Sequence, residues 1–97
     1  MLERRLRTEL ESLRLGTAPP LRKARRLVAF ARRVEAAQAD LLRTSAICYR
    51  SQDLLRGALF VESANSLGKL AAEARNCARQ ALAARAPTFG SVPIRTV

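Results

Sequence analysis

The stretch from Leu21 to Arg56, LRKARRLVAFARRVEAAQADLLRTSAICYRSQDLLR, contains neither proline nor glycine. Apolar residues recur in it at a strict spacing of seven: Leu27, Val34, Leu41, Cys48 and Leu55. A seven-residue apolar repeat is typical of a helix that keeps one seam against a neighbouring helix. We therefore predict a long helix, and we call these five residues its helical seam.

A shorter helix is expected before this stretch, from about Leu2 to Leu15. Four leucines fall on one face of it, at Leu2, Leu6, Leu10 and Leu13. Gly16 is suited to its C-terminal cap. The following Pro19–Pro20 pair requires an extended linker, so the long helix should begin near Leu21.

The long pattern is expected to break at one of two places. At residues 51–53, Ser51 could serve as a helix N-cap. At residues 63–66, Ser and Asn side chains compete for backbone hydrogen bonds. We favour the second place, so that the long helix ends near Glu62 and a third, alanine-rich helix runs from Ser66 to just before Pro87.

Two glycines complicate this assignment. Gly57 and Gly68 each cost a helix about 1 kcal/mol, so either is an alternative position for a turn. The third helix places mostly small residues on one face, which allows a close approach between helices. They are Leu67, Leu70, Ala74, Cys77, Ala81 and Ala84.

The predicted fold is all-α. It consists of a short N-terminal helix, one long heptad-patterned helix and a third Ala-rich helix, arranged as a helical hairpin or a three-helix bundle. Residues 1–87 would form a helical interaction module. Residues 88–97 would form an extended C-terminal tail, because Gly90 and Pro93 exclude regular helix.

Four residues make this tail more apolar than an inert end: Phe89, Val92, Ile94 and Val97. We interpret it as a docking peptide that lies on a partner. The alternatives are a tail folded over its own helices and a disordered end.

Composition limits the core. A chain of 97 residues makes one domain at most, and this one has only four aromatic residues. Burial stabilises by roughly 25 cal/mol per Å² of apolar area, so alanine-rich contacts contribute little. Either a partner completes the core of a weak monomer, or the chain is an ordinary, marginally stable bundle.

The net charge is +10, from 16 arginines and 2 lysines against 8 acidic residues. Six basic residues gather on the first turns of the long helix and form a candidate basic docking face: Arg22, Lys23, Arg25, Arg26, Arg32 and Arg33. Such a face favours acidic protein surfaces or phosphate backbones. The plainer alternative is a solvated helix face, with the arginine excess due to base composition.

Catalysis is not expected. The chain has no histidine, no nucleophile-elbow serine, no phosphate-binding glycine loop and no acidic pair spaced for a metal. We therefore predict neither enzyme activity nor a metal or cofactor, and expect ion pairs such as Glu3–Arg7 and Asp53–Arg56 to account for the acidic residues.

The spacing of Cys48 and Cys77 fits neither a metal site nor a redox motif, which favours a reducing intracellular compartment, cytoplasmic or organellar. No apolar run is long enough to span a membrane.

These patterns favour a non-catalytic structural or adaptor subunit of a larger assembly. It would bind other protein subunits with acidic surfaces through the helical seam, the basic docking face and the tail, and the seam also suits a homo-oligomer. The alternative is a small basic nucleic-acid-associated protein, such as a ribosomal or packaging component. An apolar repeat 29 residues long favours the subunit, because a pure nucleic-acid binder does not need one. An assembly chaperone is disfavoured by the basic charge.

Overall fold

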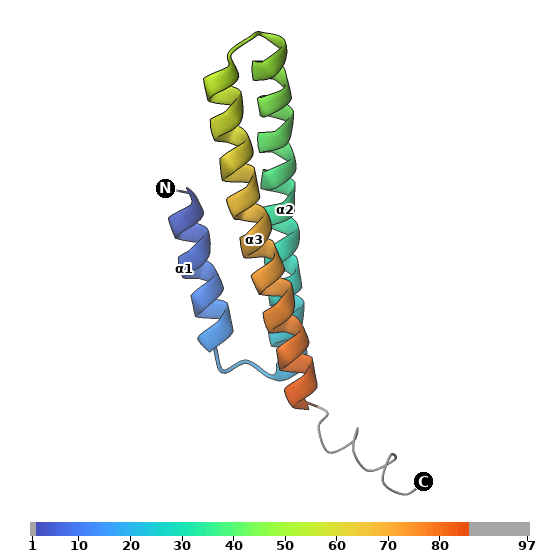
Figure 1. Ribbon diagram of the computed structural model, residues 1–97. Coiled ribbons are helices and arrows are strands. Elements are labelled where there is room, and N and C mark those ends of the chain that lie inside the picture. Colours follow the sequence, from blue (N-terminus) through green and yellow to red (C-terminus); the bar gives the residue numbers. More distant parts are fainter. Residues whose placement is uncertain (1, 86–97) are drawn as a thin grey trace, which may run out of the picture.

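The computed structural model describes residues 2–85, which form three α-helices (Figure 1). They are α1 (Leu2–Leu15), α2 (Pro20–Arg50) and α3 (Leu54–Arg85). α2 and α3 form a long antiparallel hairpin, and α1 packs beside only one half of it. The all-α prediction is confirmed: among the described residues, only the connections at 16–19 and 51–53 lie outside a helix. The tail at residues 88–97 lies outside the described residues.

The reversal between α2 and α3 lies at residues 51–53, so the favoured break at 63–66 is wrong. α2 ends in a Schellman motif, in which two backbone N–H groups turn back onto the last carbonyls of the helix. The N–H of Gln52 donates to the carbonyl of Tyr49 at 3.0 Å, and the N–H of Asp53 donates to that of Cys48 at 2.8 Å. These two hydrogen bonds terminate α2 within two residues of its C-cap, Ser51.

Asp53, not Ser51, caps the start of α3. Its carboxylate Oδ1 accepts the backbone N–H of Arg56 at 3.2 Å, which is the usual N-cap bond to the third helical position. The predicted ion pair between Asp53 and Arg56 is present at 3.5 Å. Residues 63–66 stay helical despite their polar side chains, because Ala64 is fully buried within α3.

Gln52 has a left-handed backbone conformation, with φ of 64°. A side chain is strained there, and glycine is not. Gln52→Gly should therefore raise the free energy of unfolding by about 0.5–1 kcal/mol in chemical denaturation. Ser51→Gly is the control, because Ser51 has an ordinary φ of −87° and should lose stability instead. Equal effects of the two substitutions would show that no strain exists at Gln52.

The hydrophobic core occupies the half of the hairpin that α1 covers. Its largest fully buried side chains are Leu27, Phe30 and Val34 of α2 and Leu70 of α3. Leu10 of α1 closes it, at 3 % exposure. Between the large residues lie small ones that let α2 and α3 approach closely: Ala24, Ala31, Ala71, Ala74 and Ala78.

Both glycines of α3 lie where α2 passes close by, so the alternative of a turn at either is wrong. A Cβ at Gly57 would lie 3.1 Å from the ring of Tyr49, and one at Gly68 would lie 2.7 Å from Nε2 of Gln38. The buried hydroxyl of Ser45 donates to the carbonyl of Gly57 at 2.9 Å. These contacts set the register of α3 on α2 in the half of the hairpin that contains the reversal at residues 51–53.

One bidentate ion pair links the two long helices. Arg75 of α3 donates from Nε and Nη2 to the carboxylate of Glu35 on α2, at 2.9 and 2.7 Å. These hydrogen bonds hold the pKa of Glu35 below its ordinary value and raise that of Arg75. The pair stays partly exposed, so its main effect is to favour one register of α3 on α2.

Ion pairs also attach α1 to the hairpin. Arg7 contacts Glu73 of α3 at 3.3 Å, and Glu9 pairs with Arg33 of α2. The predicted pairing of Arg7 with Glu3 is wrong, because the guanidinium of Arg7 points to Glu73 instead. α1 is thus held by its leucine face and by charges on both of its edges.

Candidate functional site

The six residues of the basic docking face all lie on the first four turns of α2, but two of them are engaged within the chain. Arg33 pairs with Glu9 and lies over the ring of Phe30, 5.5 Å from its centroid. Lys23 Nζ donates to the carbonyl of Gly16, at the end of α1, at 3.3 Å. Both side chains therefore bind α1 to α2.

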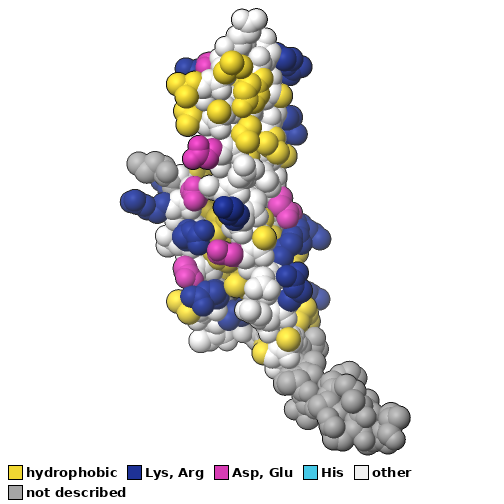
Figure 2. Space-filling view, viewed as in Figure 1, with side chains coloured by type: hydrophobic (Ala, Val, Ile, Leu, Met, Phe, Trp, Pro, Cys, Tyr) yellow, Lys and Arg dark blue, Asp and Glu magenta, His cyan; other side chains and the backbone are white. Residues whose placement is uncertain are grey.

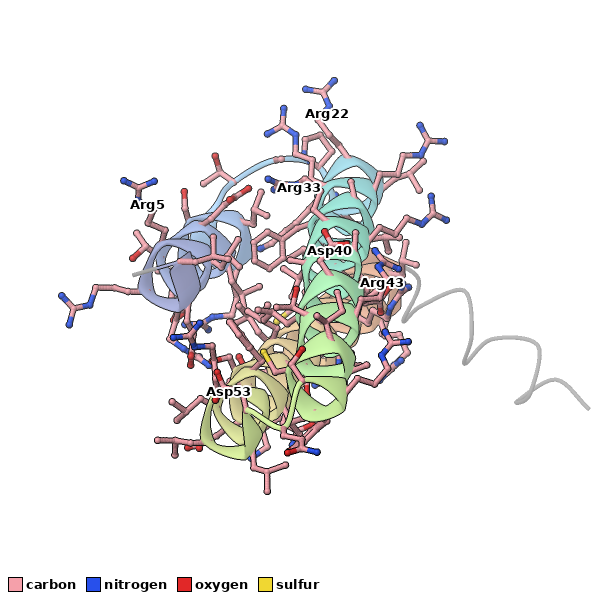
Figure 3. The ribbon with its side chains drawn as sticks, turned by 90° about the horizontal axis from the view of Figure 1, so that it is seen from above. Arg5, Arg22, Arg33, Asp40, Arg43 and Asp53 are labelled. Carbon is pink, nitrogen blue, oxygen red and sulfur yellow. The ribbon has the colours of Figure 1, made fainter. Side chains whose placement is uncertain are left out.

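The other four residues are exposed and form no ion pair within residues 2–85: Arg22, Arg25, Arg26 and Arg32. Figure 3 looks at the hairpin from its closed end and shows Arg22 pointing away from the helices, whereas Arg33 lies between α2 and α1. Each guanidinium offers a planar fork of donors that matches carboxylate or phosphate. The free part of the docking face is thus four arginines.

An apolar groove of about 370 Å³ lies beside two of these arginines. Its lining comes from α2 and from the last turns of α3, and consists of Leu21, Ala24, Arg25, Val28, Ala29, Arg32 and Leu82. A smaller recess next to it is lined by Pro19, Leu21, Arg22 and Arg25. We call the two together the basic groove.

The composition of the basic groove combines two kinds of contact. Leu21 and Leu82 are each 40 % exposed, so a partner can bury apolar area on them. Arg25 and Arg32 are seven residues apart and project from the same side of α2. The sequence pattern predicts the arginines of this site but not Leu21, Val28 and Leu82. The seven-residue spacing of Leu21 and Val28 was the available signal for an apolar strip beside the arginines.

The helical seam divides between the core and the surface. Leu27 and Val34 are completely buried within this chain and have no surface to offer a partner. Leu41 and Cys48 are half-buried. Leu55 is 74 % exposed and belongs to α3, because α2 ends before it. The five residues are therefore not a stripe on one helix.

The closed end of the hairpin, which we call the tip (residues 40–62), extends beyond α1. Figure 2 shows apolar side chains gathered there. Six large apolar side chains of the tip are between 43 and 74 % exposed: Leu42, Ile47, Tyr49, Leu54, Leu55 and Leu59. Of these, only Leu55 belongs to the helical seam predicted from the sequence.

The predicted tail-docking residues, Phe89, Val92, Ile94 and Val97, lie outside the described residues. Within residues 2–85, both cysteines are free and half-buried, and no cluster of possible ligand side chains could hold a metal ion. None of the three described helices is long and apolar enough to cross a membrane.

Comparison with protein-family models, with curated proteins and with solved structures yields no match to this chain.

Proposed function

We propose that this protein is a non-catalytic adaptor subunit that holds an acidic, amphipathic segment of a partner protein in the basic groove. The observation that carries this proposal is the pairing of unpartnered arginines with an exposed apolar floor. A helix with carboxylates on one edge and leucines on the other would use both. A phosphate backbone would use only the arginines.

The two kinds of contact have different roles. Burying the exposed parts of Leu21, Val28 and Leu82 supplies non-directional affinity in proportion to area. Arginine–carboxylate pairs at an exposed edge contribute less, about 0.2–1 kcal/mol each, but they orient the partner and speed its association. Binding should therefore weaken with salt without being abolished by it.

The alternative of a nucleic-acid partner is supported by the same four free arginines. Among residues 2–85, however, no aromatic side chain on which a base could stack lines the groove. Contact would then be limited to the backbone, with Kd of about 10⁻⁴–10⁻⁶ M near physiological salt. The apolar floor separates the two possibilities, because only a protein segment buries it.

A binding assay with two probes tests the proposal. The probes are a labelled synthetic helix with glutamates on one edge and leucines on the other, and a labelled DNA duplex, each titrated at ~0.15 M salt. The floor variant Leu21→Gln/Leu82→Gln should weaken binding of the peptide about five- to tenfold and leave duplex binding unchanged. The rim variant Arg22→Glu/Arg25→Glu/Arg32→Glu should weaken peptide binding at least tenfold and flatten its salt dependence.

The matched control for the rim variant is Arg4→Glu/Arg5→Glu/Lys69→Glu. It changes the net charge equally at exposed residues that form no ion pair within residues 2–85. Figure 3 shows Arg5 pointing away from the hairpin. The control should keep most of the peptide affinity. Equal losses in the two variants would mean that only net charge matters, and tighter binding of the duplex than of the peptide would favour the nucleic-acid function.

A further inference from the structure

The exposed apolar surface of the tip begins beside the first turn of α1. The first turn of α1 shares one recess with Leu41 of α2 and Leu67 of α3, and another with Leu59 of α3. Cys48 lies two turns beyond Leu41, and Leu55 one turn beyond Leu59, on the same sides of their helices. The side of the hairpin that packs against α1 in one half therefore extends into the tip, where no described helix packs against it.

This continuity accounts for the four members of the seven-residue repeat that lie on α2, Leu27, Val34, Leu41 and Cys48. Its first two members, Leu27 and Val34, are completely buried in the half of the hairpin that α1 covers. Leu41 borders the first turn of α1, and the last two members, Cys48 and Leu55, lie in the half that no described helix covers. An apolar stripe that extends past its own cover indicates a second helical element on the same surface.

We propose that a second copy of this chain covers the tip, so that two hairpins overlap tip to tip and antiparallel. Each tip then supplies two helices to a shared four-helix contact, with the leucines of one copy against those of the other. Six large apolar side chains of each tip are exposed, and two of them, Leu55 and Leu59, lie on the side of α3 that borders the first turn of α1.

Residues 86–97 of the same chain cannot take this place. Leu55 lies 30 helical residues from Arg85, which is about 45 Å along α3. Twelve residues span at most about 40 Å when fully extended. Fully extended, these residues would reach no farther along α3 than about Leu59, so they cannot cover Leu55 and the rest of the tip.

The charge distribution selects the tip as the surface for self-association. The tip contains three basic and three acidic residues, so its net charge is zero, and the rest of the chain carries the whole +10. Asp40–Arg43 and Asp53–Arg56 neutralise each other within it. Two copies can therefore meet at the tip without the repulsion that opposes contact between any other parts of two +10 chains.

The same arrangement keeps the basic residues apart. Arg26 lies about 30 Å along α2 from the middle of the tip, so the docking faces of two overlapping copies would be about 60 Å apart. This separation is several times the Debye length of about 8 Å at physiological salt. The dimer would present one basic groove at each end.

Sedimentation equilibrium of the full chain tests the proposal. We expect a monomer–dimer equilibrium in the micromolar range, and we expect Leu55→Gln/Leu59→Gln to raise the dimer Kd at least a hundredfold, because a two-fold interface loses four leucines at once. Leu15→Gln is the matched control. Leu15 is 69 % exposed, close to the 74 % of Leu55, but lies on α1 near the opposite end of the hairpin. It should leave the dimer Kd unchanged.

Circular dichroism checks that the double variant keeps its helices, as expected for side chains already exposed in the monomer. Salt distinguishes this proposal from the function of the basic groove, since dimerisation at a neutral, apolar surface should not weaken as salt rises and binding of the acidic peptide should. Three outcomes would overturn the proposal. They are a chain that stays monomeric at ~0.5 mM, a dimer lost equally in Leu15→Gln, and binding of neutral lipid vesicles that Leu55→Gln/Leu59→Gln abolishes.

Discussion

Phe30→Ala should lower the free energy of unfolding by about 3–5 kcal/mol. Phe30 is the largest fully buried side chain, and Leu27, Val34 and Leu70 are buried in the same core cluster. Its removal loses apolar contact and leaves a cavity that helices on three sides cannot easily close. Small domains have a total stability of about 5–15 kcal/mol. The variant should therefore lose a large share of its free energy of unfolding, which chemical denaturation followed by circular dichroism will measure.

Phe60→Ala is the matched control for this prediction. Phe60 is the same residue type on α3, but it is only half-buried and lies in the tip. We expect less than half the loss of stability, measured at a protein concentration low enough to keep the chain monomeric. A loss as large as that of Phe30→Ala would place the stabilising core in the tip and contradict the division of the hairpin into a covered and an uncovered half.

Leu10→Asp should detach α1 from the hairpin at a cost of about 4 kcal/mol or more. Leu10 is the one residue of α1 that is almost completely buried, at 3 % exposure. A carboxylate there loses the burial of a leucine and would be desolvated in the core cluster that also contains Phe30 and Leu70. Both the midpoint of denaturation and the helical signal should fall, because α1 is too short to be a stable helix alone.

The control is Leu15→Asp, the same change on the same helix at a residue that is 69 % exposed. It should change stability by no more than about 0.5 kcal/mol. If Leu10→Asp were as mild, α1 would not be part of the core. The open question from the composition, whether the monomer is weak or marginally stable, is then answered by the unfolding free energy of the unsubstituted chain.

The first helix and the start of the second could be predicted from local signals alone. Leu2–Leu15 is observed where the leucine spacing and Gly16 placed it, and α2 begins at Pro20, one residue before the expected start. Proline and glycine act through their own backbone restrictions, and the spacing of leucines follows from the helical period. None of these effects depends on what the rest of the chain does.

The position of the hairpin reversal was a different problem, because residues 51–53 and 63–66 both carry plausible local signals. Register decides between them. In an antiparallel hairpin that turns at 63–66, Val34 would face about residue 95, past Pro93 and outside any helix. A turn at 51–53 instead places Val34 and Phe30 in one core with Leu70 and Ala74. Counting residues outward from each candidate turn would have revealed this from the sequence.

The sequence by itself determined that the chain is all-α, that its long helix carries an apolar repeat and that its positive charge is concentrated at one end. Only the tertiary structure decided which parts of these patterns are buried within the chain and which stay exposed. The seven-residue periodicity does not distinguish Leu27 from Leu55. Leu27 is buried in the half of the hairpin that α1 covers, whereas Leu55 lies beyond the first turn of α1 and is exposed. Likewise, Arg33 and Arg32 are neighbours in the sequence. Only the packing of α1 gives Arg33 a carboxylate on Glu9 and leaves Arg32 exposed at the basic groove.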